Sequence, residues 1–412
     1  MNTTETKGAL EGIRVVDFSW ALAGPLAARI MADHGAQVIK IERPGGEIAR
    51  FVPPFPEESG VNRSGIFNNM NRNKYGMTLD VQNPRGLELA KKLISTSHVV
   101  VENYASGVVE KWGLGYEELC KVKPDIILAS MPAYGHSGPY RDHIGYGQTL
   151  HTLSGWFDLI GYAPDQPPTG IGFAYSDYIG GCLAATMVMA ALHRWRKTGE
   201  GSYIEVPQFE ALCAMLGPAF LDYFVNQRVA QRSGNRLPPN TRAAAPHGAY
   251  PCKGDDRWCT IAVFTDEEWK AFCKAIGEPE WVRDAKFSTI LSRMENADEL
   301  DQRVGEWTKN RAPDEVMETL QKAGVAAGAV REIRDLVDSD AQMKEYGLYK
   351  EADHAELGKR LFEENPFRLS DTPSQIDRGS PLLGEHNDFV CKDVLGLSEE
   401  EINQYIIEGV LG

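Results

Sequence analysis

The chain has 412 residues, of which 42% are hydrophobic and 25% are charged, the composition of an ordinary folded protein at a length that allows two domains. The 58 acidic side chains outnumber the 43 basic ones, which gives a formal net charge of −15. Because such a field repels phosphate and anionic lipid, we expect neither nucleic acid nor a membrane as a partner.

Short apolar runs alternate with helical periods along residues 12–130. The runs are rich in β-branched residues and are bounded by glycine or polar residues, which is typical of buried strands. Strand–helix–strand alternation predicts an α/β fold with a parallel sheet covered on both faces. We expect strands at 12–18, 36–42, 98–103 and 125–130, and helices at 25–35 and 83–97.

The rest of the chain divides at a change of composition. An apolar helix is expected at about 177–197, followed by a strand at 202–206. Residues 226–247 are basic, contain proline and glycine and lack periodicity, so they indicate a linker into a second domain. We expect that domain to open with a hairpin at 249–264, to continue with amphipathic helices, and to end with a strand that enters a helix at 324–333.

The cysteines and the apolar stretches of the chain indicate the cellular compartment in which we expect it. The seven cysteines are an odd number without a C-x-x-C pair, so we expect no disulfide framework, no zinc site and a reducing cytoplasm. The first twelve residues are polar and lack the apolar core of a signal peptide. The longest apolar stretch, residues 182–192, is shorter than the roughly 20 residues of a membrane-spanning helix, so it predicts a buried helix.

The loop after the first predicted strand is where a dinucleotide-binding fold carries its G-x-G-x-x-G motif. Of that pattern only Gly24 is present, and Pro25 follows it at an expected helix start. Glu42, at the end of the second predicted strand, stands where a ribose-binding acid would be. With one of the two expected features missing, a dinucleotide-dependent enzyme is the less favoured interpretation.

Asp177 stands at the start of the long apolar helix, in the segment GFAYSDYIGGCLAA. A carboxylate at a helix N-terminus can be a cap, or it can be a reactive group that the helix dipole keeps ionised. Gly180 and Gly181 follow in the first turns, where each costs roughly 1 kcal/mol against alanine. Two interpretations of the pair stay open: a substrate chain that lies against the backbone, or close packing with another element.

Eight short segments occur together in a specific order and spacing. Together they resemble the family III CoA-transferases, the CaiB/BaiF-like family that includes formyl-CoA transferase, over nearly the whole chain. The segments are LEGIRVVDFSWALAGP, GAQVIKIERPGG, NRNKYGMTLD, VVVENYASGVVEKWGLGYEEL, PDIILASMPAYGHSGP, YSDYIGGCLAA, GSYIEV and PLLGEH.

This resemblance implies a domain arrangement and an assembly. It implies a Rossmann-like large domain formed by both chain ends, with a smaller α/β domain inserted between them. It also implies an interlocked dimer in which each chain passes through a ring formed by the other, either as a homodimer or with a homologous subunit. With the change of composition described above, the expected limits are 1–225 and 335–412 for the large domain, 235–325 for the small one, and 226–234 and 326–334 for the linkers.

The resemblance also implies a reaction, because Asp177 matches the family's catalytic aspartate. Its carboxylate is expected to attack an acyl-CoA thioester and to carry CoA as an aspartyl thioester before passing it to a free carboxylic acid. Such a route divides one difficult exchange into smaller covalent steps. The CoA thioester is then a substrate, and we expect no metal and no redox cofactor.

Residues that match the family's CoA-binding positions follow several of the predicted strands. Arg43 and Lys111 have the chemistry to pair with CoA phosphates, although exposed, solvated charges are the alternative. The full set is Leu22, Ala23, Arg43, Leu79, Gln82, Asn103, Tyr104, Ala105, Lys111, Gly145, Tyr146, Gly147 and Gln148.

The first loop departs from formyl-CoA transferase. Leu22 replaces a polar amide side chain and Trp20 another polar residue, so backbone N–H groups or another side chain must stabilise the reacting oxyanion. The loop at 151–170 is rich in aromatic residues, and we expect Trp20 and Trp156 in a substrate pocket that accepts a bulky or aromatic acid. The chain is also similar to subunits that transfer CoA from succinyl-CoA to (R)-benzylsuccinate, which makes succinyl-CoA the expected donor. Core packing of these aromatic residues is the alternative.

Two other functions are compatible with the same fold. The α-methylacyl-CoA racemases of this fold use a histidine in a G-H-D segment, but Tyr146 occupies that position here and is a poor proton shuttle near neutral pH. His143 is three residues away, and we expect it at a different site. A non-catalytic subunit of a heteromeric enzyme is the second alternative, against which the retained Asp177 argues.

Overall fold

The computed structural model describes residues 8–162, 165–238 and 241–412, so the polar N-terminal segment and parts of the predicted loop and linker lie outside the described residues. The chain forms two compact units. The first contains residues 1–156, 171–217 and 343–412, and the second contains 157–170 and 218–342. Both ends of the sequence therefore belong to one unit, while the limits predicted for the domains and linkers stay a prediction.

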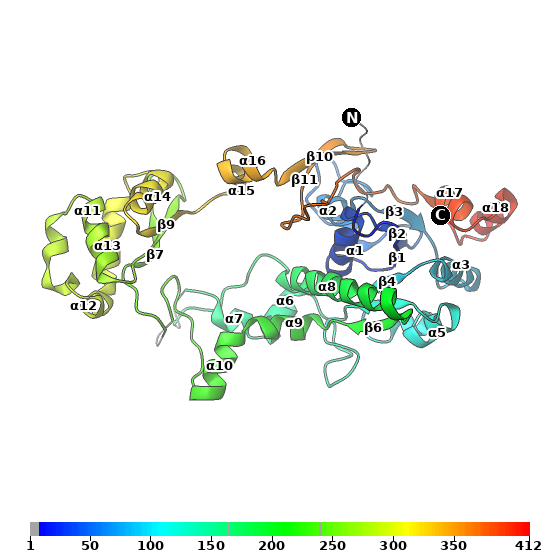
Figure 1. Cartoon of the computed structure of the whole chain (residues 1–412), viewed down its shortest axis with the longest axis horizontal. Coiled ribbons are helices and arrows are strands. Elements are labelled where there is room, and N and C mark those ends of the chain that lie inside the picture. The colour runs from blue at the N-terminus through cyan, green and yellow to red at the C-terminus, as the bar shows by residue number, and fades with distance from the viewer. Residues whose placement is uncertain (1–7, 163–164, 239–240) are drawn as a thin grey trace. The chain divides into compact units, whose positions relative to one another are not determined.

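A six-stranded parallel sheet forms the centre of the first unit, which confirms the predicted α/β class (Figure 1). The four strands predicted before residue 130 are all present, and residues 202–206 supply the edge strand. In spatial order the strands are β3 (Tyr75–Thr78), β2 (Gln37–Glu42), β1 (Arg14–Asp17), β4 (Val99–Glu102), β5 (Ile127–Ser130) and β6 (Ser202–Glu205).

Both faces of this sheet are buried, because successive side chains of a strand point to opposite sides. Val15 packs on one face against α1 (Ala23–Asp33) and α8 (Tyr175–Thr198). Val16 packs on the other face against α3 (Pro84–Ser95) and the C-terminal helices. The last segment of the chain thus completes the core built by the first, and α17, drawn in red, lies beside β3 (Figure 1).

Shorter elements connect and cover the sheet of the first unit. They are η1 (Ile48–Phe51), α2 (Gly65–Asn71), α4 (Val108–Lys111), α5 (Tyr116–Val122), α6 (Gly147–Leu153), α9 (Gln208–Met215), the hairpin β10 (Tyr349–His354) and β11 (Gly358–Glu363), α17 (Asn387–Phe389), η4 (Val390–Val394) and α18 (Glu399–Ile407). Three helices cross the boundaries between the units, α7 (Trp156–Leu159), α10 (Gly217–Asn226) and α16 (Ala341–Tyr346).

The second unit has a three-stranded antiparallel sheet with its own apolar core. Its first two strands are the predicted hairpin, and β9 is the strand predicted within residues 324–333, although residues 326–334 were also predicted as a linker. The elements are β7 (His247–Pro251), β8 (Trp258–Ala262), α11 (Asp266–Ala275), η2 (Glu280–Arg283), η3 (Ala285–Phe287), α12 (Ile290–Glu295), α13 (Ala297–Thr308), α14 (Pro313–Lys322), β9 (Ala326–Ala329) and α15 (Ile333–Asp338). Within the described ranges, none of the helices is long and apolar enough to cross a membrane.

Candidate active site

Two adjoining cavities lie in the first unit, beyond the carboxyl ends of the parallel strands, where ligands of open α/β sheets usually bind. The first cavity has a volume of about 360 Å³ and the second, which contains Asp177, about 310 Å³. Trp20, Ile48 and Tyr104 line both. Volumes of roughly 300–1,000 Å³ are typical of small-molecule sites, so the pair can hold a long ligand that extends from one cavity into the other.

Asp177 is the third residue of α8, and the structure separates it from a capping role. The N-cap is Ala174, which has no side-chain capping bond. Ser176 Oγ donates to Asp177 Oδ2 at 3.2 Å, and the backbone of Ala23 at the start of α1 also hydrogen-bonds the carboxylate. Burial raises the pKa of Asp177 to about 6, against these hydrogen bonds, which lower it. The carboxylate therefore still ionises at neutral pH, but less readily than its helix position alone predicts.

Close packing between elements accounts for Gly180 and Gly181. A Cβ on Gly181 would lie 2.6 Å from the carbonyl oxygen of Ala23, and one on Gly180 would lie 3.2 Å from Cγ of Gln208. Of the two open interpretations, close packing between elements is therefore the one that the contacts support. Because α8 approaches α1 so closely, Asp177 lies beside the first turn of α1.

The loop after β1 carries Trp20 into both cavities. Its backbone is clamped by Asn103, whose Oδ1 accepts from Trp20 N at 2.8 Å and whose Nδ2 donates to Trp20 O at 2.9 Å. The indole stacks on the ring of Tyr104, with centroids 5.7 Å apart. Ala21 follows with φ of 59°, a left-handed conformation that costs an L-residue roughly 1 kcal/mol. Hydrogen bonds to surrounding groups, and not the conformational preference of its own residues, therefore hold this loop in place.

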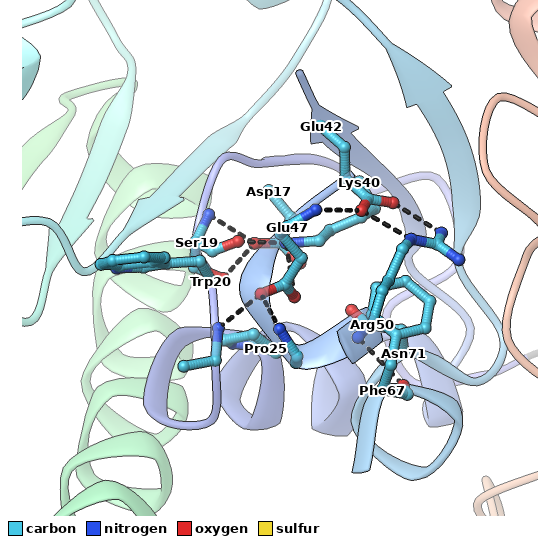
Figure 2. Close-up of polar contacts among 12 residues, drawn as sticks. Asp17, Ser19, Trp20, Pro25, Lys40, Glu42, Glu47, Arg50, Phe67 and Asn71 are labelled. Atoms are coloured by element: carbon cyan, nitrogen blue, oxygen red, sulfur yellow. Dashed lines mark hydrogen bonds and ion pairs between the residues drawn. The ribbon is translucent and has the colours of Figure 1, made fainter. Parts of the chain in front are cut away.

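A set of buried charges supplies those bonds (Figure 2). Glu47 Oε2 accepts from the amide of Ala21 at 2.8 Å, and its other carboxylate oxygen lies 3.6 Å from Lys40 Nζ. Lys40 Nζ in turn donates to the carbonyl of Ser19. Glu47 and Lys40 are both buried, so the loop is tied to the sheet by charged groups that have little access to water.

Two further buried ion pairs extend this set. Lys74 Nζ lies 2.8 Å from Asp17 Oδ2, and Arg50 pairs with both oxygens of Glu42 at 2.7 Å. Burial alone raises the pKa of Asp17, but Lys74 and Lys40 outweigh it and lower that pKa. Burial also lowers the pKa of Lys74 to about 8. The guanidinium of Arg50 additionally lies over the ring of Phe67, which Figure 2 shows.

Most of the predicted site residues come together at these cavities. The second cavity is lined by Trp20, Leu22, Asn103, Tyr104, Ala105, Gly145, Tyr146, Gly147 and Asp177. The first cavity is lined by Trp20, Arg43, Leu79, Gln82 and Tyr104. A Cβ on Gly147 would lie 3.3 Å from Asp177 Oδ2, so this glycine leaves room for the carboxylate.

Other predicted residues lie outside the cavity walls. Lys111 is exposed at the end of α4, and Ala23 is buried and reaches Asp177 through its backbone. The side chain of Gln148 donates to the carbonyl of Ile171 at 2.9 Å. Trp156, expected in the substrate pocket, packs beside Leu150 and Leu212, and its indole N–H donates to the Leu212 carbonyl at 3.0 Å.

The structure also places residues at the site that the sequence interpretation missed. Ile48 lines both cavities, and Arg141 and His143 line the second one with Asp177. The expectation that His143 belongs to a different site is therefore wrong, because the loop after β5 folds back over the cavity. The available signal was the arginine and the histidine in YRDHIGYG, directly after the last matched segment of that region.

Comparisons with known proteins give matches over nearly the whole chain. The sequence pattern of CoA-transferase family III matches residues 10–387. The chain is 31% identical to succinyl-CoA–D-citramalate CoA-transferase of Chloroflexus aurantiacus, over 98% of both chains. It is also 31% identical to the beta subunit of succinyl-CoA–L-malate CoA-transferase of the same organism, again over 98% of both. The crystal structure of a CAIB/BAIF family protein from Brucella suis superimposes with a TM-score of 0.86 at 30% identity, covering 94% of this chain and all of that one.

The buried pair of Arg50 and Glu42 predicts a large stability effect. Arg50→Met leaves the Glu42 carboxylate buried and unpaired, so we expect urea unfolding to show a loss of about 3–5 kcal/mol. In the double variant with Glu42→Gln the buried charge is gone, and most of the loss should be recovered. Arg194→Met, which breaks an exposed pair with Glu200, is the matched control and should cost less than about 1 kcal/mol. Equal losses of unfolding free energy in Arg50→Met and Arg194→Met would contradict the assignment of Arg50 and Glu42 as a buried, stabilising ion pair.

Proposed function

The chain belongs to CoA-transferase family III and is an enzyme that transfers CoA, and we propose that it does so from an acyl-CoA donor to a free carboxylic acid with Asp177 as the covalent catalyst. The observation that carries the proposal is the place of Asp177. It is a carboxylate in the wall of the second cavity, which adjoins the first cavity, and the two are of similar size. A nucleophile needs access to its substrate, and a CoA ester needs room for a long chain.

In the first half of the reaction, Asp177 takes CoA from the donor. The carboxylate attacks the thioester carbonyl, the C–S bond breaks, and a mixed anhydride and the CoA thiolate result. The thiolate then attacks the aspartyl carbonyl and releases the donor acid, which leaves CoA on Asp177 as a thioester. Each step exchanges one acyl bond for another, so no oxidant or reductant is needed.

The second half runs in the opposite direction with the acceptor acid. The acceptor carboxylate attacks the aspartyl thioester, which gives a new mixed anhydride and frees the thiolate. Attack of the thiolate on the acceptor's carbonyl forms the product acyl-CoA and restores the Asp177 carboxylate. CoA is thus a substrate throughout, and we propose no additional cofactor.

The first turn of α1 is the proposed source of oxyanion stabilisation. Leu22 has no side-chain hydrogen-bonding group, but the backbone of Ala23 already hydrogen-bonds the Asp177 carboxylate. When a thiolate attacks the aspartyl carbonyl, negative charge develops on the carboxyl oxygen that does not carry the acyl group, and this amide is the proposed donor to it. An amide fixed by helix geometry can stabilise it without reorganisation.

The first cavity is the proposed place of the CoA nucleotide and the second that of the acyl group. Arg43 and Gln82 supply polar groups to the first, and Trp20 and Tyr104 line the passage between them. Lys111, exposed and outside both walls, stays a proposed phosphate ligand only through its match to the family.

Succinyl-CoA is the proposed donor, with an aromatic or bulky acid such as (R)-benzylsuccinate as the acceptor. The two curated relatives described above carry succinyl-CoA in their names, which supports the donor. The aromatic rings of Trp20, Tyr104, Tyr134 and Tyr146 in the wall of the second cavity support a bulky acceptor.

A racemase is the less favoured alternative, because Tyr146 and not a histidine occupies the G-H-D position. His143 does line the cavity, so deuterium incorporation at the α-carbon of 2-methylacyl-CoA in heavy water is the discriminating measurement. A non-catalytic subunit is the other alternative, and activity of the chain expressed alone would exclude it.

We also propose that the chain works as an interlocked dimer, with a second copy or with a homologous subunit. Exposed apolar side chains along α8 and α9 support this, among them Leu183, Met187 and Met215. One of the relatives described above is named as a beta subunit, which supports the heteromeric form. Apolar surface of this kind is usually covered in an assembly.

Trapping of the aspartyl intermediate tests the proposed chemistry. With acyl-CoA and hydroxylamine, the anhydride or thioester on Asp177 should become a hydroxamate, and mass spectrometry should locate it on the peptide with YSDYIGG. Asp177→Ala should lose CoA transfer and this label, yet still bind acyl-CoA. Cys182→Ser, on the same helix, is the control and should be labelled like wild type. Label on a cysteine, or full activity of Asp177→Ala, would remove the proposal.

The pKa of Asp177 predicts the acid side of the pH profile. The nucleophile is active when it is deprotonated, so kcat/KM should be flat near pH 7 and fall about tenfold per unit as the pH drops below about 6. Ser176→Ala removes a hydrogen bond that lowers this pKa, so its midpoint should move to higher pH. A midpoint near 4 in wild type, or no shift in Ser176→Ala, would contradict the prediction.

Sedimentation tests the assembly. At micromolar concentration the active species should be a dimer, since interlocked subunits of this kind usually bury more than roughly 2,000 Å². Met187→Asp should weaken the association, whereas Arg196→Gln, also exposed on α8, should not. A stable and fully active monomer would show that the proposal is incorrect.

A further inference from the structure

Two side chains of opposite charge stand out in the wall of the second cavity. Asp177 supplies a carboxylate, and Arg141 supplies the sole permanently cationic side chain among the described residues that line it. The remainder of the wall is mostly aromatic, aliphatic or amide. The proposed reaction does not use this guanidinium, so its place beside the acyl group needs a separate explanation.

Arg141 is available to a ligand. Within the described part of the chain, its side chain pairs with the neighbouring Asp142, Nε to Oδ1, at 3.3 Å. The side chains of Arg141 and Asp142 are 54% and 78% exposed, and exposed pairs of this kind contribute about 0–1 kcal/mol. A carboxylate that enters the cavity can therefore take over the guanidinium at little cost.

The loop that carries Arg141 is held in place on both sides. The ring of His143 stacks on Tyr140 with centroids 5.0 Å apart, and it meets Tyr134 edge-on at 5.9 Å. Tyr134 is itself 7% exposed. Farther along, a Cβ on Gly145 would lie 2.3 Å from that of Ala133, so the returning chain is packed against the segment after β5. The guanidinium is thus presented from an ordered aromatic turn.

Acid substrates have an electrostatic difficulty at this site. The distal carboxylate of a dicarboxylic donor has the same charge as the Asp177 carboxylate that it meets, and a dicarboxylic acceptor brings two negative charges into the same cavity. A guanidinium offsets that charge and matches a carboxylate in a bidentate geometry that lysine does not offer. In the proposed route both donor acyl group and acceptor react at Asp177, so they occupy the same cavity in turn.

We propose that Arg141 binds the distal carboxylate of dicarboxylic substrates, and that the enzyme therefore selects dicarboxylic acyl groups in both half-reactions. This inference rests on the proposed function and assigns a substrate class to its site. His143 is a secondary donor beside Arg141. The reacting carboxyl group then faces Asp177 while the far end of the acid is held by charge, which fixes its orientation.

Matched substrate pairs test this assignment. Succinyl-CoA and butyryl-CoA have the same chain length and differ in the distal carboxylate, as do succinate and butyrate as acceptors. In Arg141→Gln, kcat/KM for succinyl-CoA and succinate should fall about 10- to 100-fold, the usual loss for a hydrogen-bonded charge. The values for butyryl-CoA and butyrate should stay within about threefold of wild type. Arg141→Lys should lose less than Arg141→Gln, because it keeps the charge but not the fork.

Every outcome of this comparison decides the matter. A loss confined to the dicarboxylic partners supports the assignment, and Arg196→Gln, exposed on α8 away from both cavities, should show none. An equal loss with both partners would mean that Arg141 holds CoA and would overturn it, as would no loss at all. Failure of the proposed function is distinguishable, because labelling of Asp177 by hydroxylamine with butyryl-CoA does not depend on a distal carboxylate.

Discussion

The candidate site depends on charges that are buried under the loop after β1. Lys40 and Glu47 have almost no access to water, and each is stabilised there by the opposite charge of the other. Together they bind the carbonyl of Ser19 and the amide of Ala21, the two backbone groups on either side of Trp20. Removing one member of such a set leaves an uncompensated charge in a low-dielectric interior. The position of the loop is therefore determined by electrostatics at the end of the sheet, and this loop leads directly into the start of α1.

The start of α1 and the start of α8 together form the candidate chemical centre. Gly181 lets the two helices approach so closely that a single methyl group would collide with the backbone of Ala23. Asp177 therefore lies beside backbone amides of α1 as well as those of its own helix, α8. Burial raises its pKa while those amides and Ser176 lower it, and the balance near 6 leaves a carboxylate that is charged at neutral pH but weakly solvated. Weak solvation is useful in a nucleophile, because less water has to leave before it attacks.

Much of the sheet was predictable from the sequence, because strands buried on both faces are continuous apolar runs such as VVVE and ILAS. β3 was missed, since YGMT is short, contains a glycine and lacks that signature. Asp177 was identified through its segment, together with Ala23 and Gly147 beside it, but the charged groups that hold the neighbouring loop were not. The buried role of Lys40 is invisible locally, because it depends on Glu47 and Asp17, which only the fold brings near. For the same reason Trp156, an attractive pocket residue in the sequence, packs beside Leu212, while Arg141 and His143 reach the cavity through a loop with no periodicity.

The aromatic contact between Trp20 and Tyr104 has a kinetic consequence if the proposed reaction is correct. Both rings belong to both cavities, so a ligand that fills the pair is held at two ends with this contact between them. In the proposed reaction, a thiolate released next to Asp177 would stay tethered through the part of CoA in the first cavity. Its recapture would then be effectively unimolecular, with an effective molarity that can reach about 10⁵ M or more. Retention of the leaving group in this way favours transfer over hydrolysis, and it lets a reactive anhydride exist for only a short time.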